Sequence, residues 1–182
     1  EEFGDRILKP LENGAVKTNS ELSKNLIVLD GNLSVSTLSK IAENKKIMNY
    51  DIRVASASSS KASRLKPFLS LSNVTIYCNM TEAENLCDLS FQNTEQASTY
   101  LLKKGLGRAI VTNGDKHICD ASIHHEPILI APPKVKNINH ITGAGDYFLA
   151  CHIANEINQL GKEKALLKAA ESASKYVETE IL

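Results

Sequence analysis

Short apolar runs alternate with amphipathic segments along most of this chain. Apolar runs without polar alternation are typical of strands buried on both faces of a sheet. They predict strands at 26–30, 51–55, 74–78 and 108–112, followed by two short strands, read as a hairpin, at 117–121 and 127–130. Apolar residues at helical spacing predict helices at 35–46, 60–71, 81–86, 95–104, 144–160 and 162–177.

This alternation is typical of an α/β protein. It predicts a single α/β domain over residues 1–182, with a Rossmann-like, mostly parallel sheet covered by helices on both faces. Residues 1–24 lack the rhythm and predict loops and a short helix. Ligands of such sheets bind outside the carboxyl ends of the strands, and most polar motifs of this chain directly follow a strand.

Composition narrows the class of protein. The 182 residues carry 21 Lys and Arg against 21 Asp and Glu, so no basic surplus indicates a nucleic-acid partner. No apolar run is long enough to cross a bilayer, so no membrane partner is expected. The four cysteines form no Cys-x-x-Cys pair, which favours reduced thiols and a cytoplasmic protein.

The most informative motif is Gly143-Ala144-Gly145-Asp146 at the start of an apolar helix. A helix that begins in such a turn directs free backbone N–H groups at one point, which suits a phosphate. Asp146, in the first turn, could then reach a hydroxyl beside that phosphate. This pattern favours phosphoryl transfer to an alcohol. The alternative is a plain glycine-rich turn in which Asp146 only favours the helix dipole.

Thr142 to Asp146, followed by this helix, resembles the C-terminal signature of the ribokinase-like (PfkB) sugar and nucleoside kinases. The resemblance implies ATP as the phosphoryl donor. It also implies that Gly143, Ala144 and Gly145 form the anion hole and that Asp146 is the catalytic base. The acceptor would be the primary hydroxyl of a small-molecule sugar or nucleoside.

Asn79-Met80-Thr81-Glu82 follows a predicted strand and opens a predicted helix. Asn-x-x-Glu is also a motif of the ribokinase-like family, and the resemblance implies that Asn79 and Glu82 help to hold Mg²⁺. Mg²⁺ commonly takes one or two carboxylates together with water and phosphate oxygens. The structural alternative is a helix cap at Thr81, with Glu82 near the positive end of the helix.

Thr112-Asn113-Gly114 follows the strand at 108–112 and is similar to the segment that lines the nucleotide in related kinases. The last glycine of that family pattern is replaced here by His117. A plain turn after a strand explains the same residues without a ligand.

Two further segments resemble the pseudouridine kinase branch of the family. Asp30-Gly31-Asn32 follows the first strand, and Lys61 lies in a serine-rich segment after the second. The resemblance implies that Asn32 and Lys61 face the phosphates and that Ala173 flanks the adenine. A strand-end turn, a solvated helix start and simple helix packing are the structural alternatives for these residues.

Two departures from the family pattern stand out. His140 occupies a position where relatives usually carry Asp or Asn, and nothing before residue 26 resembles the sugar-binding N-terminal part and lid of the family.

The motifs together make an ATP-dependent kinase the leading hypothesis. Its best substrate would be pseudouridine, which gives pseudouridine 5′-phosphate. The alternative is a truncated or degenerate relative that binds a nucleotide or a partner without catalysis. A homodimer is compatible with this hypothesis. A dinucleotide-binding Rossmann protein would need G-x-G-x-x-G after the first strand, and this chain does not have it.

Overall fold

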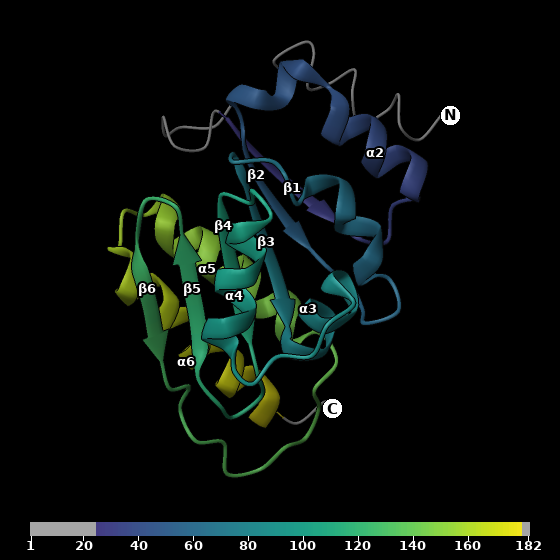
Figure 1. Ribbon diagram of the computed structural model, residues 1–182. Helices are drawn as coiled ribbons and strands as arrows, with labels where there is room; N and C mark the ends of the chain where they lie inside the picture. The colour runs from purple at the N-terminus through teal and green to yellow at the C-terminus, as the bar shows by residue number, and fades with distance from the viewer. Residues whose placement is uncertain (1–24, 180–182) are drawn as a thin grey trace.

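The computed structural model describes residues 25–179. Figure 1 shows one twisted sheet between two layers of helices. The six strands lie side by side in chain order. β1 to β4 are parallel, whereas β5 and β6 pair antiparallel as a hairpin. The strands are β1 (Leu26–Asp30), β2 (Asp51–Ala55), β3 (Val74–Asn79), β4 (Arg108–Thr112), β5 (Ile118–Ser122) and β6 (His125–Ile130).

Helices cover both faces of this sheet. One layer holds α2 (Val35–Glu43), the 3₁₀ helices η2 (Lys45–Asn49) and η3 (Ala62–Phe68), α3 (Met80–Cys87) and α4 (Thr94–Lys103). The other layer holds α5 (Ala144–Ile157) and α6 (Lys162–Glu178), which pack against each other. The predicted α/β class, with a mostly parallel sheet between two helical layers, is confirmed.

Two hydrophobic clusters fill the space between the sheet and its helices. Along β3, Ile76 belongs to the cluster beneath α2 to α4, and the next residue, Tyr77, belongs to the cluster beneath α5 and α6. Adjacent residues of a strand point to opposite faces, so a strand buried on both faces must be apolar throughout. This requirement explains why the apolar runs located the strands correctly.

The helix predicted at 35–46 ends earlier, at Glu43. The backbone N–H of Asn44 bonds to the Ile41 carbonyl, and its side chain accepts a hydrogen bond from the Lys46 amide. Asn44 therefore ends one helix and caps the next. Asn side chains compete in this way for backbone groups, which makes them frequent at helix ends.

The helix predicted at 60–71 is instead the shorter 3₁₀ helix η3. Pro67 lies inside it and has no backbone N–H to donate. Proline also disfavours the α conformation of the preceding residue, here Lys66. The apolar spacing of Leu65 and Phe68 did place the buried face correctly, because both are fully buried.

The predicted helix at 144–160 is three residues too long. α5 ends at Ile157, and Gln159 has a left-handed backbone with φ of 61°. The amide of Leu160 bonds back to the carbonyl of Asn155 across this reversal. Such a left-handed residue closes many helices, and here no glycine marks it in the sequence.

Gly107, which precedes β4, offers a test of this packing. A Cβ atom at Gly107 would lie 1.9 Å from the Ser72 carbonyl oxygen, so we expect Gly107→Ala to lower the free energy of unfolding by at least about 2 kcal/mol. A Cβ at Gly161 would meet no atom within 4 Å, so Gly161→Ala should stay within about 0.5 kcal/mol of the parent. Urea unfolding of both variants measures the difference, and equal stabilities would contradict the close approach at Gly107.

Candidate active site

Helix α5 runs opposite to the parallel strands. Its His152 contacts Tyr77 in the second half of β3, and Glu156, one turn later, contacts Arg108 at the first position of β4. The N-terminal end of α5 therefore points toward the carboxyl ends of the strands, where α/β sheets bind ligands. Asp146 lies about 9 Å farther along the helix axis than His152 in that direction, at 1.5 Å per residue.

The turn at the start of α5 leaves two backbone amides free. Ala144 donates to the Ile141 carbonyl at 3.0 Å, and Tyr147 donates to the Gly143 carbonyl at 2.9 Å. The amides between them, of Gly145 and Asp146, have no hydrogen-bond acceptor within residues 25–179. Free amides at a helix N-terminus form an anion-binding site, and the helix dipole adds to their attraction.

The two glycines of this turn are constrained differently. Gly143 has φ of 87°, and a Cβ there would lie 2.8 Å from the hydroxyl of Tyr176. Gly145 has open space where a Cβ would be. Gly143 is therefore required by backbone conformation and by a neighbour, whereas Gly145 leaves the surface in front of the free amides unobstructed.

Asp146 stands in the first turn of α5 and is exposed. No hydrogen bond or ion pair engages its carboxylate within the described residues. A carboxylate without a structural partner, beside free amides, is available to accept a proton from a hydroxyl. Gly143, Ala144, Gly145 and Asp146 thus lie on one turn, and their roles as anion hole and base stay predictions.

Asn79 and Glu82 form a capping box at the start of α3. The Asn79 side chain accepts from the Glu82 amide at 2.9 Å, and the Glu82 carboxylate accepts from the Asn79 amide at 2.8 Å. The cap that the structural alternative placed at Thr81 is instead Asn79, two residues earlier. A helix cap does explain the pair in part, but it engages only one Glu82 oxygen, and one carboxylate is a sufficient protein ligand for Mg²⁺.

Thr112, Asn113 and Gly114 lie next to this capping box. Thr112 is the register partner of Asn79 across β3 and β4. The following turn is closed by a bond from the Lys116 amide to the Asn113 carbonyl at 2.9 Å, and Gly114 has φ of 57°. The turn is thus formed without a ligand, but it stands at the same edge of the sheet as the capping box.

Asn32 and Lys61 come together from the ends of β1 and β2. The Lys61 ammonium donates to the Asn32 side chain, and the backbone amide of Asn32 donates to the Asp30 carboxylate at 2.6 Å. Arg64 reaches the carbonyls of Asn32 and Leu33 at 3.4 Å each, and the sequence motifs did not single it out as a site residue. Within residues 25–179 neither cation is paired with a carboxylate, so both remain available to an anion.

Ala173 is half-buried on α6 and packs against the cluster beneath α5 and α6. Helix packing accounts for a small residue there. Its expected contact with adenine therefore stays a prediction.

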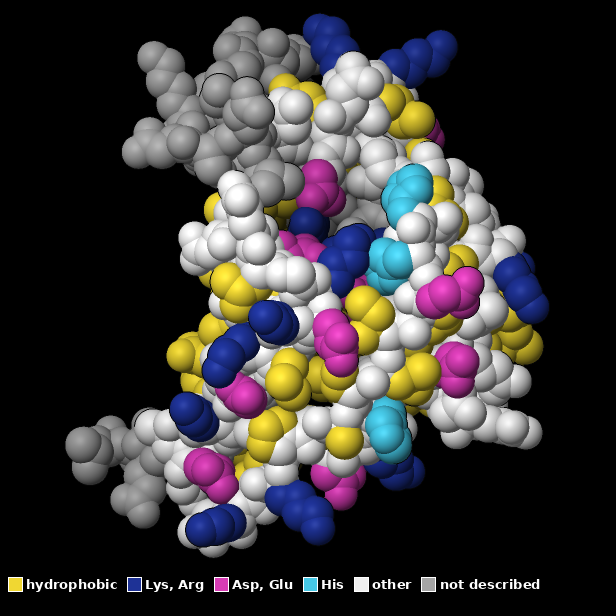
Figure 2. Space-filling view, turned by 90° about the vertical axis from the view of Figure 1, so that its left-hand side faces the viewer, with side chains coloured by type: hydrophobic (Ala, Val, Ile, Leu, Met, Phe, Trp, Pro, Cys, Tyr) yellow, Lys and Arg dark blue, Asp and Glu magenta, His cyan; other side chains and the backbone are white. Residues whose placement is uncertain are grey.

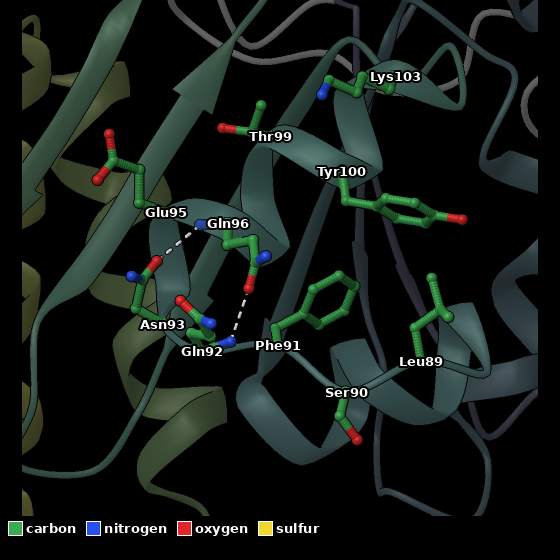
Figure 3. Close-up of a pocket in the computed structure, with 10 residues that line it drawn as sticks. All are labelled: Leu89, Ser90, Phe91, Gln92, Asn93, Glu95, Gln96, Thr99, Tyr100 and Lys103. Carbon is green, nitrogen blue, oxygen red and sulfur yellow. Dashed lines mark hydrogen bonds between the residues drawn. The ribbon is translucent and has the colours of Figure 1, made fainter.

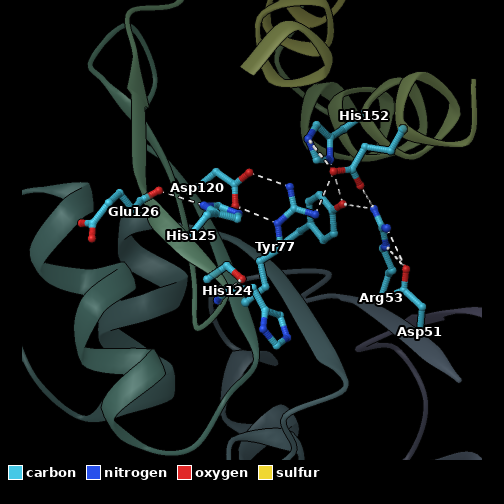
Figure 4. Close-up of polar contacts among 11 residues, drawn as sticks. Asp51, Arg53, Tyr77, Asp120, His124, His125, Glu126 and His152 are labelled. Carbon is cyan, nitrogen blue, oxygen red and sulfur yellow. Dashed lines mark hydrogen bonds and ion pairs between the residues drawn. The ribbon is translucent and has the colours of Figure 1, made fainter. Parts of the chain in front are cut away.

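A buried ionic network joins α5 to the sheet (Figure 4). The Glu156 carboxylate pairs with Arg53 of β2 and with Arg108 of β4, the latter at 2.8 Å. Arg53 also bonds to Asp51 at 2.7 Å, and Arg108 to the fully buried Asp120 at 2.5 Å. Both arginines lie in strands that the hydrophobic pattern placed correctly, but their partners lie far away in the sequence.

His152 occupies the same buried region. Its Nδ1 lies 2.9 Å from the Tyr77 hydroxyl, and its Nε2 has no hydrogen-bond partner within the described residues. Burial lowers the pKa of His152 to about 4, which outweighs the attraction of Glu156. Burial alone would raise the pKa of Glu156, but Arg108 and Arg53 lower it to about 2. At neutral pH, Glu156 is therefore charged and His152 neutral.

The lowered pKa of His152 predicts that the free energy of unfolding falls as the solution is acidified. The unfolded histidine takes up a proton near pH 6.5 but the folded one only near pH 4, so stability falls as pH drops across that window. We expect His152→Gln to remove up to about 1.4 kcal/mol per pH unit of this dependence. Urea unfolding at pH 7, 6 and 5 measures it, and parallel curves for both proteins would contradict a lowered pKa.

A surface depression lies away from these residues. It has a volume of about 490 Å³ and is lined by residues 89–103 at the end of α3 and along α4. In Figure 3, the Gln96 side chain accepts from the Gln92 amide at 2.7 Å, and the Asn93 side chain accepts from the Gln96 amide at 2.8 Å. None of the site residues predicted from the sequence lines this depression, so it is not part of the candidate site.

The described surface carries no strong bias of charge in the view of Figure 2, where Lys and Arg side chains alternate with Asp and Glu. Among the described residues, no helix combines the length and apolar character needed to span a bilayer. No group of three or more His, Cys, Asp or Glu side chains is placed to hold a metal ion within residues 25–179. The four cysteines are free thiols.

The chain belongs to the pfkB family of carbohydrate kinases, whose family model matches residues 2–180. No curated protein matches the chain. The family membership agrees with the glycine-rich turn and the exposed aspartate at the start of α5.

Solved structures share the fold. A putative sugar kinase from Clostridium perfringens matches with a TM-score of 0.77 and 20% identity, over 99% of this chain and 53% of its own. Arabidopsis thaliana ribokinase, complexed with ribose and ATP, matches with a TM-score of 0.68 and 20% identity, over 90% of this chain and 54% of its own. Adenosine kinase from Schistosoma mansoni matches with a TM-score of 0.70 and 18% identity, over 87% of this chain and 52% of its own. This chain therefore spans about half the length of these structures.

Proposed function

We propose that this chain carries the phosphoryl-transfer site of an ATP-dependent kinase that acts on the primary hydroxyl of a sugar or nucleoside. The observation that carries the proposal is the start of α5, where two unpaired amides and the unpaired carboxylate of Asp146 share one turn. Free amides stabilise a transferring phosphoryl group, and an adjacent carboxylate can take the proton of the attacking hydroxyl. Membership of the pfkB family supports the same chemistry.

The other residues take roles around that turn. Asp146 acts as the base, and the turn from Gly143 to Gly145 holds the phosphoryl group through its unpaired amides, since the Ala144 amide is bonded to the Ile141 carbonyl. Thr112, Asn113, Gly114 and Ala173 contact the nucleotide, and Asn32 and Lys61 approach its phosphates. Asn79 and Glu82 would hold Mg²⁺, which neutralises phosphate charge when bound.

Pseudouridine is the proposed acceptor. The support is the motif pair around Asn32 and Lys61, which the fold brings into contact at the carboxyl edge of the sheet. Solved structures at this level of identity share the fold alone and leave the acceptor open. The four free thiols of this chain fit a cytoplasmic enzyme with a small-molecule substrate. A homodimer is compatible with this function.

A non-catalytic relative that binds a nucleotide or a partner is the second candidate. Two observations favour it: Asp146 is exposed, and His117 replaces the last glycine of the segment that lines the nucleotide in related kinases. ADP release from Mg·ATP, measured with and without pseudouridine, ribose, uridine or adenosine, separates the two candidates. Binding of ATP without acceptor-dependent ADP release would establish the second.

The role of Asp146 predicts the behaviour of Asp146→Asn. The amide cannot accept the hydroxyl proton, so we expect kcat to fall by about two to four orders of magnitude with ATP binding retained. Asp115→Asn, in the exposed turn after β4, is a matched control that should leave kcat unchanged. Steady-state ADP release measures kcat, calorimetry measures ATP binding, and unchanged turnover of Asp146→Asn would exclude it as the base.

Glu82→Gln separates the magnesium role from the helix cap. A glutamine can still accept the hydrogen bond from the Asn79 amide, so the melting temperature should stay within about 2 °C of the parent. Loss of the charge should raise the Mg²⁺ concentration needed for half-maximal ADP release by about tenfold. An unchanged magnesium requirement would leave Glu82 with the cap alone.

A further inference from the structure

The C-terminal end of α6 forms hydrogen bonds with the turn at the start of α5 and with the segment before it. The segment that leads to it, residues 131–143, has no helix or strand of its own. The Lys136 amide bonds to the Glu178 carboxylate at 2.7 Å, and the Asn139 amide bonds to the Val177 carbonyl at 3.0 Å. A loop of this length without secondary structure is usually functional, and here it is ordered along one helix end.

Tyr176 continues this contact to the turn itself. Its hydroxyl donates to the Thr142 carbonyl at 3.0 Å. Its ring stacks on Tyr147 with centroids 4.9 Å apart, and His140 meets it edge-on at 4.4 Å. The Tyr176 side chain thus touches residues immediately before and after the anion-binding turn.

The hydrogen bond to Thr142 engages the carbonyl that the Asp146 amide would use if α5 began one residue earlier. Gly143 is the N-cap of α5, so Asp146 is its third residue, and its amide, like the first amides of any helix, has no acceptor in the described part of the chain. A helix extended back by one residue would pair this amide with the Thr142 carbonyl, which the Tyr176 hydroxyl holds instead. Gly143 adopts φ of 87°, a conformation that favours glycine, and a Cβ there would lie 2.8 Å from the Tyr176 hydroxyl.

We propose that Tyr176 is a positioning residue that keeps the Asp146 amide free for an anion by holding the Thr142 carbonyl away from it. The proposal rests on the proposed function for its catalytic meaning. Its structural content, an amide kept out of the helix by a side chain from another helix, is testable without turnover.

Tyr176→Phe removes the hydroxyl and keeps the ring. Tyr147→Phe is the matched control, since its hydroxyl has no hydrogen-bond partner among the described residues. With its carbonyl released, Thr142 can accept from Asp146, so hydrogen exchange of the Asp146 amide should slow by about three- to tenfold in Tyr176→Phe only. Amide exchange followed by NMR on the full 182-residue chain measures this directly.

Inorganic phosphate provides the second measurement. Phosphate should shift the amide signals of Gly145 and Asp146 in the parent, with affinity about tenfold weaker in Tyr176→Phe and unchanged in Tyr147→Phe. If the parent turns over, Tyr176→Phe should lower kcat about tenfold while the KM for ATP stays nearly constant.

The outcomes separate the two proposals. Slow exchange of the Asp146 amide in the parent would overturn the role of Tyr176 whatever the variants do. Exchange and phosphate affinity of Tyr176→Phe equal to those of the parent would overturn it as well. Absence of ADP release by the parent with every acceptor would remove the kinase function, while slowed exchange and weakened phosphate binding in Tyr176→Phe would still support Tyr176.

Discussion

One carboxylate sets the position of the functional helix. Glu156 of α5 lies between Arg53 of β2 and Arg108 of β4, which also bond to Asp51 and Asp120. A buried charge that loses its partner costs several kcal/mol, and sliding α5 along the sheet would separate the Glu156 carboxylate from both guanidinium groups. Apolar packing alone tolerates small shifts, whereas this pairing allows one register. The N-terminal turn of α5 is therefore held at a fixed height over the carboxyl ends of the strands.

A second constraint acts at the opposite end of α5. The C-terminal residues of α6 bind the loop 131–143, and Tyr176 fixes its last carbonyl before the turn. The ionic network sets where the helix lies, and the α6 contacts set the backbone conformation with which it begins. Both are needed, because an anion site requires amides that are correctly placed and also unbonded.

The sequence predicted the strands well, because a strand buried on two faces must be continuously apolar. It predicted helix ends less well, since Asn44 and Pro67 interrupt patterns that apolar spacing alone would continue. The candidate site residues were found from local motifs that follow strands. Tyr176 and the ionic network were missed because Tyr176 and Glu156 contact residues that lie tens of positions away in the sequence. Arg53 and Asp120, which are charges inside predicted strands, were the signals of buried pairs.

The exposure of Asp146 separates two requirements of the proposed reaction, which are anion binding and proton abstraction. Its carboxylate is exposed, and a hydrated carboxylate takes a proton from an alcohol poorly unless the acceptor displaces the water around it. The amides of the same turn need no such closure to attract a phosphate, because their direction is set by the helix. The proposed anion binding thus needs only the amides of this turn. Proton abstraction depends on whatever surface holds the acceptor over Asp146, which makes phosphate affinity and turnover independently testable.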